Sequence, residues 1–385
     1  MVRVLFFNYS NEPGGAEQSL LGLLSGLDKS RFNPSLLTFG HGPLSERARN
    51  LGITVHTLEG APGLSAFGRD RLLSAAVRGL FHMPALFRTL VKIRRVLREG
   101  RFAVLHTNNP KSHVLGALAS AGLPIRLVFH MRDIFPHKSN AARLLSLLGR
   151  VRKAQTLAIS RAVQKALPAG LKNRSHLLYN GVLLPCPALS RAAVRTGLGI
   201  PDNALLIMST GRLVPWKGFD LLIRAAAPLL ARYEARLLIA GEAYYGERDL
   251  RPELIALAGT LGVPDRVMLP GYVEDIPSLL AAADLFVLPS ENEPFGRALV
   301  EAMLAGLPCV AFNQGGPAEI ILHNETGWLV DERSAPALQD ALARLLSDAE
   351  LRRVLGERAK IAAREQFPLA RTLAGLATFY DGLEA

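Results

Sequence analysis

Short apolar runs alternate with segments of helical periodicity along almost the whole chain, and this alternation limits the possible folds more than any other feature. Runs rich in Val, Ile, Leu and Phe, each followed by an amphipathic segment, are typical of βα units around a mostly parallel sheet. In the first half the predicted strands are 2–8, 34–39, 54–58, 103–107, 126–130, 156–159 and 176–179. The predicted helices between them include 16–27, 111–121, 143–153 and 161–167. The pattern predicts a doubly wound α/β domain.

A second series of the same kind follows a stretch with two prolines, Pro185 and Pro187, which we predict to be the linker. Its predicted strands are 205–209, 236–240, 266–269, 285–288, 309–312 and 327–330. At 385 residues the chain is longer than most single domains. We therefore expect two Rossmann-like domains, 1–184 and 185–368, facing an interdomain cleft. Pro368 sets apart a last helix, about 369–385, which we expect to pack back on the first domain.

The net charge of +12 is unevenly distributed. Residues 1–185 hold 26 Lys and Arg against 8 Asp and Glu, whereas the remainder holds 19 against 25. A basic half favours anionic partners such as a membrane surface, nucleic acid or a phosphorylated substrate. The alternative is that the charge serves only solubility.

Bulk composition argues for a folded protein in a reducing compartment. Apolar residues make up 49% of the chain and charged residues 20%, which is ordinary for a globular protein. Every apolar stretch is shorter than the roughly 20 residues that span a bilayer, and the amino terminus is predicted to be a strand rather than a signal peptide. Cys186 and Cys309 have no metal-like spacing. We expect a cytoplasmic protein without disulfides.

The sequence STGRLVPWKG at residues 209–218 lies between a predicted strand and a predicted helix. Arg212 offers a forked guanidinium and Lys217 a point charge, five residues apart on a glycine-bearing turn. Two such cations suit one diphosphate. The alternative is a surface loop with incidental cations.

The second motif is ENEPFGRALVEAM at residues 291–303, again after a predicted strand. Pro294 suits the opening of a helix, whose free amides would face a phosphate or sugar hydroxyls. Glu293 would precede this helix and Glu301 would lie about two turns into it. Carboxylates accept hydrogen bonds from vicinal diols of a hexose or ribose. The alternative is acidic residues favoured by the helix dipole, which explains Glu293 better than Glu301.

The pattern Gly-Arg-x4-Lys-Gly followed by Glu-x7-Glu resembles the retaining glycosyltransferases of the GT-B type, in the large family 4 (glycosyl transferases group 1). That family includes bacterial cell-surface mannosyl-, glucosyl- and galactosyltransferases and the sucrose and sucrose-phosphate synthases. Four further segments match in order: PGGAE at 13–17, NGV at 180–182, PGYV at 270–273, and GGPAE at 315–319 with Thr326-Gly327. The likeness covers nearly the whole chain.

The resemblance implies a role for each matched residue. Arg212 and Lys217 would neutralise the donor diphosphate, Glu301 would bind the ribose, and Glu293 would hold the transferred sugar. The remaining implied donor contacts are the amides around Phe295 and Gly296, Tyr272 in the base-side loop, and Gly14 and Gly15 of the first domain. It also implies that no metal is needed, because the cations and helix amides stabilise the leaving group.

His130 ends a predicted strand and corresponds to the family's cleft histidine, so we expect it to contact the sugar or the acceptor. A lone histidine is more often structural, although the strand end favours a functional role. His106 is a weaker candidate of the same kind. The resemblance gives no agreed nucleophile and implies front-face attack, so the candidate catalytic residues are His130, Glu293, Arg212 and Lys217.

Residues 69–101 interleave apolar and basic side chains, with Pro84 expected to break or bend the helix. Such a segment can lie in an anionic membrane interface. The alternative, at least as well supported, is a core-facing helix with a solvated basic face. The segment has no aromatic platform for single-stranded nucleic acid, and no nucleic-acid partner is expected.

Taken together, these features predict a hexosyltransferase that moves a sugar from a nucleoside-diphosphate donor, with retention, to a glycan, glycolipid or small-molecule acceptor in the bacterial cell envelope. The donor is a co-substrate, and no cofactor is expected. A nucleotide-sugar 2-epimerase of the same architecture is one alternative, and a non-catalytic sugar-nucleotide-binding subunit is another. The sequence leaves the base, the sugar and the acceptor open.

Overall fold

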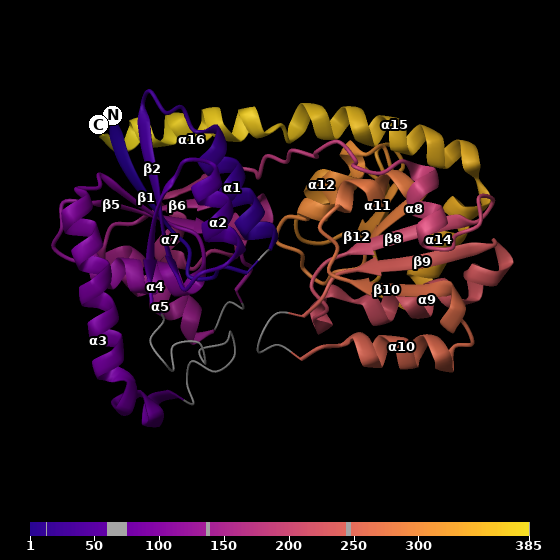
Figure 1. Ribbon diagram of the computed structural model, residues 1–385, viewed down its shortest axis with the longest axis horizontal. Coiled ribbons are helices and arrows are strands. Elements are labelled where there is room, and N and C mark those ends of the chain that lie inside the picture. Colours follow the sequence, from indigo (N-terminus) through magenta and orange to yellow (C-terminus); the bar gives the residue numbers. More distant parts are fainter. Residues whose placement is uncertain (13, 60–74, 136–138, 244–247, 385) are drawn as a thin grey trace. The chain divides into compact units, whose positions relative to one another are not determined.

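The computed structural model describes residues 1–12, 14–59, 75–135, 139–243 and 248–384, with backbone only for 75–82 and 384. Internal contacts divide the chain into two compact units. Unit 1 comprises Met1–Gly181 and Leu369–Ala385, and unit 2 comprises Val182–Pro368. Both are parallel sheets covered by helices (Figure 1). The predicted architecture of two Rossmann-like domains is therefore confirmed.

Unit 1 contains a seven-stranded sheet in the order β3-β2-β1-β4-β5-β6-β7, with every pair parallel. The strands are β1 (Val2–Phe7), β2 (Phe32–Phe39), β3 (Thr54–Leu58), β4 (Val104–Thr107), β5 (Arg126–Met131), β6 (Gln155–Ala158) and β7 (Ser175–Leu177). The chain winds outward from β1 to β3 and then returns to place β4 on the other side of β1. The loops after β1 and β4 therefore meet at the topological switch point, where open α/β sheets bind ligands.

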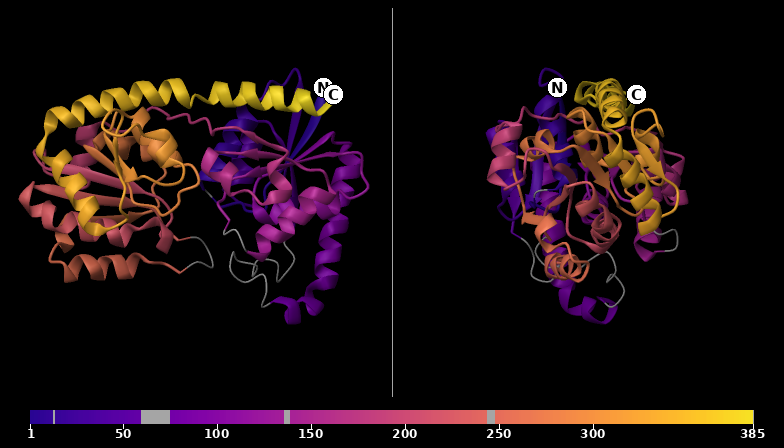
Figure 2. Two further views of the ribbon diagram at one scale, coloured as in Figure 1. Left: turned by 180° about the vertical axis from the view of Figure 1, so that it is seen from behind. Right: turned by 90° about the vertical axis from the view of Figure 1, so that its right-hand side faces the viewer.

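The helices of unit 1 connect these strands. They are α1 (Gly15–Gly26), α2 (Pro43–Asn50), α3 (Ala75–Gly100), α4 (Pro110–Ala119), α5 (Asn140–Val151), α6 (Arg161–Ala166), α7 (Ala169–Lys172) and the last helix of the chain, α16 (Leu369–Glu384). The last helix packs against α1 (Figures 1 and 2). Gly181 allows the chain to approach it closely, because a Cβ there would lie 2.4 Å from the Cα of Leu369. Pro84 lies inside α3 rather than ending it.

Unit 2 contains a six-stranded parallel sheet in the order β10-β9-β8-β11-β12-β13, with its switch point between β8 and β11. Its strands are β8 (Leu205–Thr210), β9 (Ala235–Ala240), β10 (Val267–Gly271), β11 (Leu285–Leu288), β12 (Cys309–Phe312) and β13 (Trp328–Val330). Its helices are α8 (Arg191–Gly197), η1 (Pro215–Lys217), α9 (Phe219–Arg232), α10 (Arg251–Thr260), η2 (Pro264–Arg266), α11 (Ile276–Ala282), α12 (Arg297–Leu304), α13 (Pro317–Ile320), α14 (Ala335–Ser347) and α15 (Ala349–Gln366).

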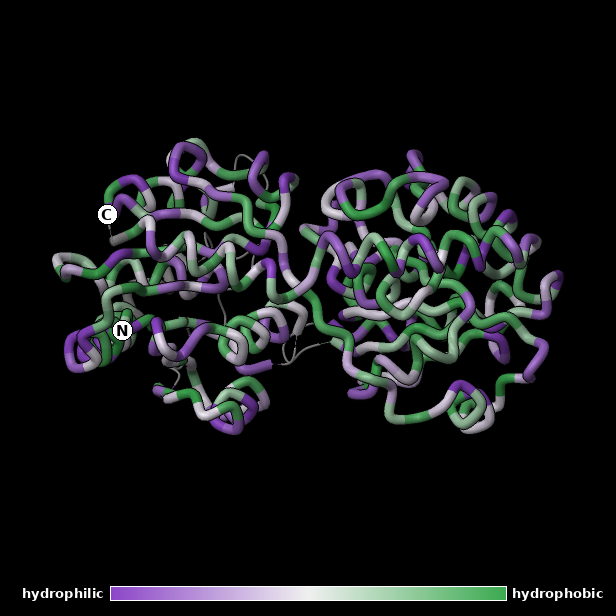
Figure 3. The backbone as a smooth tube through the Cα atoms, turned by 90° about the horizontal axis from the view of Figure 1, so that it is seen from above, coloured by the Kyte–Doolittle hydropathy of each residue, from purple (hydrophilic) through white to green (hydrophobic). Residues whose placement is uncertain are grey.

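Each unit has its own apolar core, made by the strands and the inner faces of the helices. Figure 3 shows the hydrophobic segments gathered in the middle of each unit. The strands are buried on both faces, as Leu206–Met208 and Leu285–Leu288 show, because helices cover both sides of each sheet. The boundary at Gly181 and Val182 lies three residues before the position expected from sequence, and Pro185 and Pro187 lie within unit 2.

Candidate active site

The loops that follow β8 and β11 meet at the switch point of unit 2 and bring Lys217 and Glu293 together. Lys217 Nζ lies 2.7 Å from Glu293 Oε2, and the two side chains are 13% and 12% exposed. The two residues are 76 positions apart in sequence, so only the parallel sheet brings them into contact. A largely buried ion pair at a strand-end edge can change partners when an anion with its own charge arrives.

Gly218 shapes the cation-bearing turn. Its φ of +69° is left-handed, and a Cβ there would lie 2.4 Å from the carbonyl oxygen of Pro289 in the loop after β11. The Glu291 N–H donates to the Trp216 carbonyl oxygen at 2.7 Å, which ties the same two loops together. The glycine is therefore required both by conformation and by close approach.

Lys217 is also held from the side by an aromatic ring. Its Nζ lies 4.4 Å from the centre of the Trp216 ring, a cation–π distance. Arg212 is half-buried on the same turn, at the carboxyl end of β8. The two cations predicted to bind a diphosphate are thus both at the switch point, and Lys217 is oriented by Glu293 and Trp216.

Two glycines, Gly315 and Gly316, pack against the backbone of the Glu293 loop. The Gly316 N–H donates to the Glu293 carbonyl oxygen at 2.8 Å. A Cβ on Gly315 would lie 2.4 Å from that oxygen, and one on Gly316 would lie 2.2 Å from the Phe295 carbonyl oxygen. The segment GGPAE, matched only as a motif in the sequence, therefore fixes the backbone that carries Glu293 and the amides of Phe295 and Gly296.

The helix after Glu293 starts later than predicted. Gly296, with φ of +103°, is the N-cap, and α12 begins at Arg297 rather than at Pro294. Glu301 therefore lies one turn into the helix, not two. The left-handed glycine explains the shift, because it turns the chain sharply after Phe295, whose ring is buried.

Glu301 pairs with a cation on its own helix. Arg297 Nε lies 2.9 Å from Glu301 Oε1, and the two side chains are 19% and 18% exposed. Burial raises the pKa of the Glu301 carboxyl, and the positive charge and hydrogen bond of Arg297 oppose that shift only in part. On acidification the carboxylate therefore loses its charge sooner than an ordinary glutamate.

Tyr272 follows β10 and is 45% exposed, so its ring is available to a ligand. The Gly241 N–H after β9 donates to the Gly271 carbonyl oxygen at 2.8 Å, and the Gly211 N–H donates to the Ala240 carbonyl oxygen at 3.0 Å. The ends of β8, β9 and β10 are thereby joined. The base-side loop belongs to the same edge of unit 2 as Lys217.

The glycine loop of unit 1 lies between β1 and α1. Gly14 is the N-cap of α1 with an extended backbone, Gly15 opens the helix and is exposed, and Pro13 falls outside the described residues. Glu17 in the first turn accepts a hydrogen bond from Asn8 Nδ2 at 3.1 Å. The glycines therefore place the first turn of α1 at the switch point of unit 1.

His130 lies near the end of β5, as predicted, but it is only 1% exposed. Its Nδ1 lies 3.0 Å from His106 Nε2 and 3.3 Å from an Arg132 guanidinium nitrogen. Burial, followed by the charge of Arg132, lowers the pKa of His130 well below its usual value. The imidazole is therefore neutral, and its contact with a substrate remains a prediction.

Unit 1 also contains a buried polar network that sequence reasoning missed. Arg132 donates through Nε to Asn108 Oδ1 at 2.6 Å and through a terminal nitrogen to Asn180 Oδ1 at 2.8 Å. Asn108 Nδ2 in turn donates to Asn8 Oδ1 at 2.9 Å. The available signal was position, because Asn8 and Asn108 directly follow the two strands that flank the switch point.

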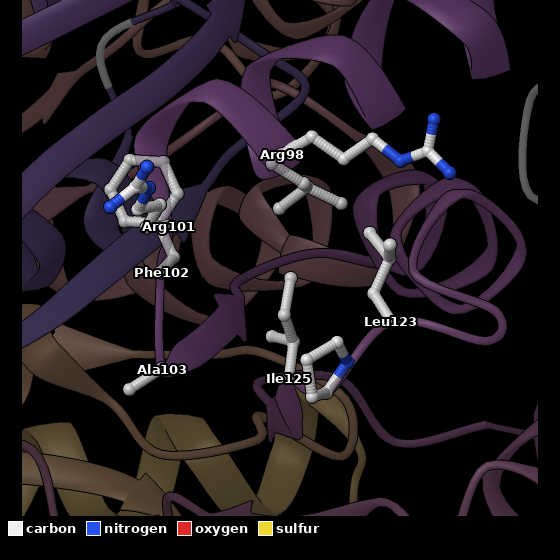
Figure 4. A pocket seen from close by; sticks show the side chains of 8 residues that line it. Arg98, Arg101, Phe102, Ala103, Leu123 and Ile125 are labelled. Atoms are coloured by element: carbon white, nitrogen blue, oxygen red, sulfur yellow. The ribbon is translucent and has the colours of Figure 1, made fainter.

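A cavity of about 330 Å³ lies at the opposite edge of unit 1. Figure 4 shows Arg101 and Phe102 on one side of it and Leu123 and Ile125 on the other. These residues precede β4 and β5, so the cavity is at the amino ends of the strands. Ligands of such sheets bind at the carboxyl ends, and we do not assign the donor to this cavity.

Among residues 1–12, 14–59, 75–135, 139–243 and 248–384, no group of three or more His, Cys, Asp and Glu side chains is placed to hold a metal ion. Among the same residues, no helix is both long enough and apolar enough to cross a bilayer.

Two family models match the two halves of the chain. Residues 13–184 match Glycosyltransferase Family 4, and residues 190–362 match Glycosyl transferases group 1. The chain is a GT-B glycosyltransferase. The predictions of family and enzyme class are confirmed.

Relatives of this glycosyltransferase include the uncharacterized glycosyltransferase MJ1607 of Methanocaldococcus jannaschii, 28% identical over 71% of this chain and 73% of that protein. N-acetyl-alpha-D-glucosaminyl L-malate synthase of Bacillus anthracis is 32% identical, over 47% of this chain and 46% of its own length. Among solved structures, Anabaena Alr3699/HepE in complex with UDP-glucose is 26% identical, with a TM-score of 0.85 over 99% of this chain and 100% of that one.

Proposed function

We propose that this glycosyltransferase transfers a hexose from a nucleoside-diphosphate sugar, with retention of anomeric configuration. The observation that carries the proposal is the Lys217–Glu293 ion pair at the switch point of unit 2, held in place by Gly218 and Gly316. UDP-glucose is the first donor to test, because the structure of the similar Anabaena protein contains it.

Each donor group has a proposed partner in unit 2. Arg212 and Lys217 bind the diphosphate, and Glu301 accepts hydrogen bonds from the ribose. Glu293 and the amides of Phe295 and Gly296 hold the transferred sugar, and Tyr272 lies against the base. When the diphosphate engages Lys217, the Glu293 carboxylate becomes available to sugar hydroxyls, so donor binding itself prepares the sugar site.

The geometry of Glu293 supports front-face attack. Its carboxylate is held by Lys217 before the donor binds, and in the donor complex it is proposed to accept hydrogen bonds from sugar hydroxyls, so both states disfavour it as a nucleophile. The bond between the sugar C1 and the β-phosphate oxygen breaks, the acceptor oxygen bonds to C1 on the same face, and the acceptor proton passes to the departing phosphate. The two cations and the α12 amides stabilise the leaving charge, and we propose that no metal takes part.

The experiment measures nucleotide release and product configuration for the full chain with UDP-glucose and a panel of other nucleoside-diphosphate sugars. Thermal shift first ranks the nucleotides, since a bound ligand stabilises the folded state. Slow release of nucleotide without acceptor, unchanged by a chelator, together with an α-linked product from an α-donor, is expected. Fast release without acceptor indicates the epimerase, and no release from any donor indicates a non-catalytic subunit; either outcome contradicts the proposal.

For the acceptor, we propose a glycan or glycolipid at an anionic membrane surface. Helix α3 buries one stripe, with Ile93 and Leu97 almost fully covered, and exposes another formed by Met83, Phe87 and Val91. Both interpretations of residues 69–101 thus find support in α3, and residues 69–74 lie outside the described residues. Arg88, Lys92 and Arg98 lie on the exposed side.

Helix α5 repeats this arrangement. Its exposed apolar side chains are Leu144, Leu147 and Val151, and α4 packs against both α3 and α5. Apolar side chains among cations suit a lipid interface with anionic headgroups. In a vesicle sedimentation assay with anionic lipid at low salt, Phe87→Glu and Leu147→Glu should reduce binding, and Ile361→Glu in unit 2, which is as exposed, should not. Equal binding of all variants, or no binding at all, rules out this surface.

A further inference from the structure

Three side chains, Tyr380, His106 and His130, form a buried hydrogen-bonded relay that starts on the last helix and ends at His130. The Tyr380 hydroxyl lies 2.7 Å from His106 Nδ1, and His106 Nε2 lies 3.0 Å from His130 Nδ1. Tyr380 and His130 are each 1% exposed, and His106 is fully buried. Tyr380 belongs to α16, which is about 250 residues distant from β5 in sequence yet lies in unit 1 as well.

The direction of each hydrogen bond follows from Arg132. A guanidinium only donates, and one of its terminal nitrogens lies 3.3 Å from His130 Nδ1. The tautomer with a proton on Nδ1 would bring an N–H close to this cation. His130 Nδ1 is therefore an acceptor, and because burial keeps the ring neutral, the single proton lies on Nε2.

His106 is fixed in the same way one step further along. Its Nε2 must donate to His130 Nδ1, so its own neutral ring has a lone pair at Nδ1. Within the described part of the chain, the partner of this atom is the Tyr380 hydroxyl, which donates to it. Each hydrogen bond of the relay is thus donated in the same direction, from the Tyr380 hydroxyl to His106 and from His106 to His130.

The last nitrogen of this relay, His130 Nε2, is buried and has no hydrogen-bond partner within the described ranges 1–12, 14–59, 75–135, 139–243 and 248–384. In unit 1 the Thr38 and Thr156 hydroxyls and the Arg152 Nε share this property. A hydroxyl can rotate to find a partner and Arg152 donates through a terminal nitrogen to the Ser120 carbonyl oxygen, whereas Nε2–H is the single donor of the neutral His130 ring. A buried N–H held in one direction without an acceptor is a site for an incoming oxygen.

We propose that Tyr380, acting through His106, holds His130 as a neutral Nε2–H donor to an oxygen of the substrate, so that Tyr380 and His106 are positioning residues for transfer. This rests on the proposed function in one respect only, the nature of the substrate. An Nε2 that carries its proton has no lone pair with which to accept another, so His130 is not the general base. The acceptor proton must go elsewhere, which agrees with its passage to the diphosphate.

The state of the two rings can be read directly, without any turnover. In long-range ¹H–¹⁵N spectra of the full chain with ¹⁵N-labelled histidine, both His106 and His130 should give the pattern of a neutral Nε2–H ring at pH 7. Their signals are identified by loss in His106→Gln and His130→Gln. An Nδ1–H or charged pattern for His130 overturns the proposal, and this holds whether or not a donor has been found.

Substitution of Tyr380 tests the role in transfer. Tyr380→Phe keeps the ring and removes the donor, and it should let His106 populate its Nδ1–H form and lower kcat about tenfold, with the KM for the donor changed less than twofold. Thr378→Val, which removes a hydroxyl from the exposed side of the same helix, should have no effect. A Tyr380→Phe enzyme with the kcat of Thr378→Val contradicts the proposal.

A second pair of variants separates positioning from folding. His106→Gln retains an amide that can donate to His130 Nδ1, whereas His106→Leu has none. If both fold, as judged by circular dichroism and melting temperature, His106→Gln should keep most of the activity that His106→Leu loses. Equal loss in the two overturns the relay. If the unaltered protein transfers no sugar from any donor, the proposed function fails, and the tautomer of His130 still decides the relay.

Discussion

The two units share one architecture but hold their polar groups in different ways. At the switch point of unit 2, a cation and a carboxylate compensate each other at 2.7 Å. At the switch point of unit 1, Asn8 and Asn108 are joined by a neutral hydrogen bond of 2.9 Å, and the nearby buried histidines are uncharged. The ion pair of unit 2 suits an anionic ligand that replaces one partner, whereas amide and imidazole groups held by Arg132 in unit 1 suit recognition of hydroxyls.

Removal of the Lys217 cation should give the largest effect. Lys217→Ala deletes one proposed diphosphate ligand and leaves Glu293, only 12% exposed, without its charge partner. We expect kcat/KM for the donor to fall about 1000-fold, because a preorganised group that stabilises the leaving charge is lost. Arg224→Ala, which removes an exposed cation from α9, is the matched control. Undiminished transfer by Lys217→Ala would remove the diphosphate site from unit 2.

Acidification should distinguish the units by stability. Burial, with the charge of Arg132, lowers the pKa of His106 and His130 well below the usual value and lowers that of His113 to about 3. Below about pH 6.5 the unfolded chain takes up protons that folded unit 1 does not, so the free energy of unfolding falls. At pH 5.5 the three rings together lower it by about 4 kcal/mol.

Unit 2 provides the control within the same molecule, because its one histidine, His323, is exposed. Hydrogen exchange of the full chain at pH 7.5 and 5.5, corrected for intrinsic rates, should show protection lost from β4 and β5 and largely kept in β8 and β11. Equal losses in the two sheets would mean that the buried histidines do not govern the acid response.

Glycine substitutions should separate the tasks of the two units. In Gly316→Ala the new Cβ would lie 2.2 Å from a backbone oxygen of the Glu293 loop, and in Gly181→Ala it would lie 2.4 Å from the Cα of Leu369. Each should destabilise its unit by about 3 kcal/mol, because backbone has to move. Gly316→Ala should also weaken nucleoside diphosphate binding. Gly181→Ala should reduce hydrogen-exchange protection in α16 and leave nucleoside diphosphate binding unchanged.

The control for both is Gly197→Ala, since among the described residues no atom beyond its chain neighbours and the backbone of its own helix lies within 4 Å of the new methyl group. That variant should be as stable as the unaltered protein or slightly more so, because alanine favours α8. Identical effects of Gly316→Ala and Gly181→Ala on nucleotide binding would argue against separate tasks.

How much the sequence revealed depended on whether the relevant contact was local. The strands 54–58, 285–288 and 309–312 were predicted to the residue, because a buried parallel strand is a short apolar run. The start of α12 was placed too early, since Pro294 is a strong helix signal and the left-handed turn at Gly296 overrides it. Neither error nor success here depended on distant residues.

The surroundings of the site residues could not be predicted from the sequence, because they depend on long-range packing. His130 was recognised by its position at a strand end, yet its buried hydrogen-bonded surroundings include His106 on β4 and, through His106, Tyr380 on α16, which are distant in sequence. No local pattern marks Tyr380 among the apolar residues of α16. The roles of Arg212, Lys217, Glu293 and Glu301 remain predictions, although the structure brings Lys217 and Glu293 into contact.

The smallest expected effect concerns Glu301, the one carboxylate of the candidate site whose pKa is raised by burial, with Arg297 at 2.9 Å opposing the shift. As pH falls, a carboxyl with a raised pKa gains its proton sooner than an ordinary glutamate and then accepts fewer hydrogen bonds from the ribose. The affinity for uridine diphosphate, measured by calorimetry, should therefore fall more between pH 7.5 and 5.0 in the unaltered protein than in Glu301→Gln. Because the phosphate of the ligand titrates in the same range, only this difference between the two proteins is informative.

Glu325→Gln, an exposed substitution in the same unit, should retain the full pH dependence. If Glu301→Gln also retains it, the ribose contact lies elsewhere, and the burial of Glu301 belongs to the packing of α12 alone.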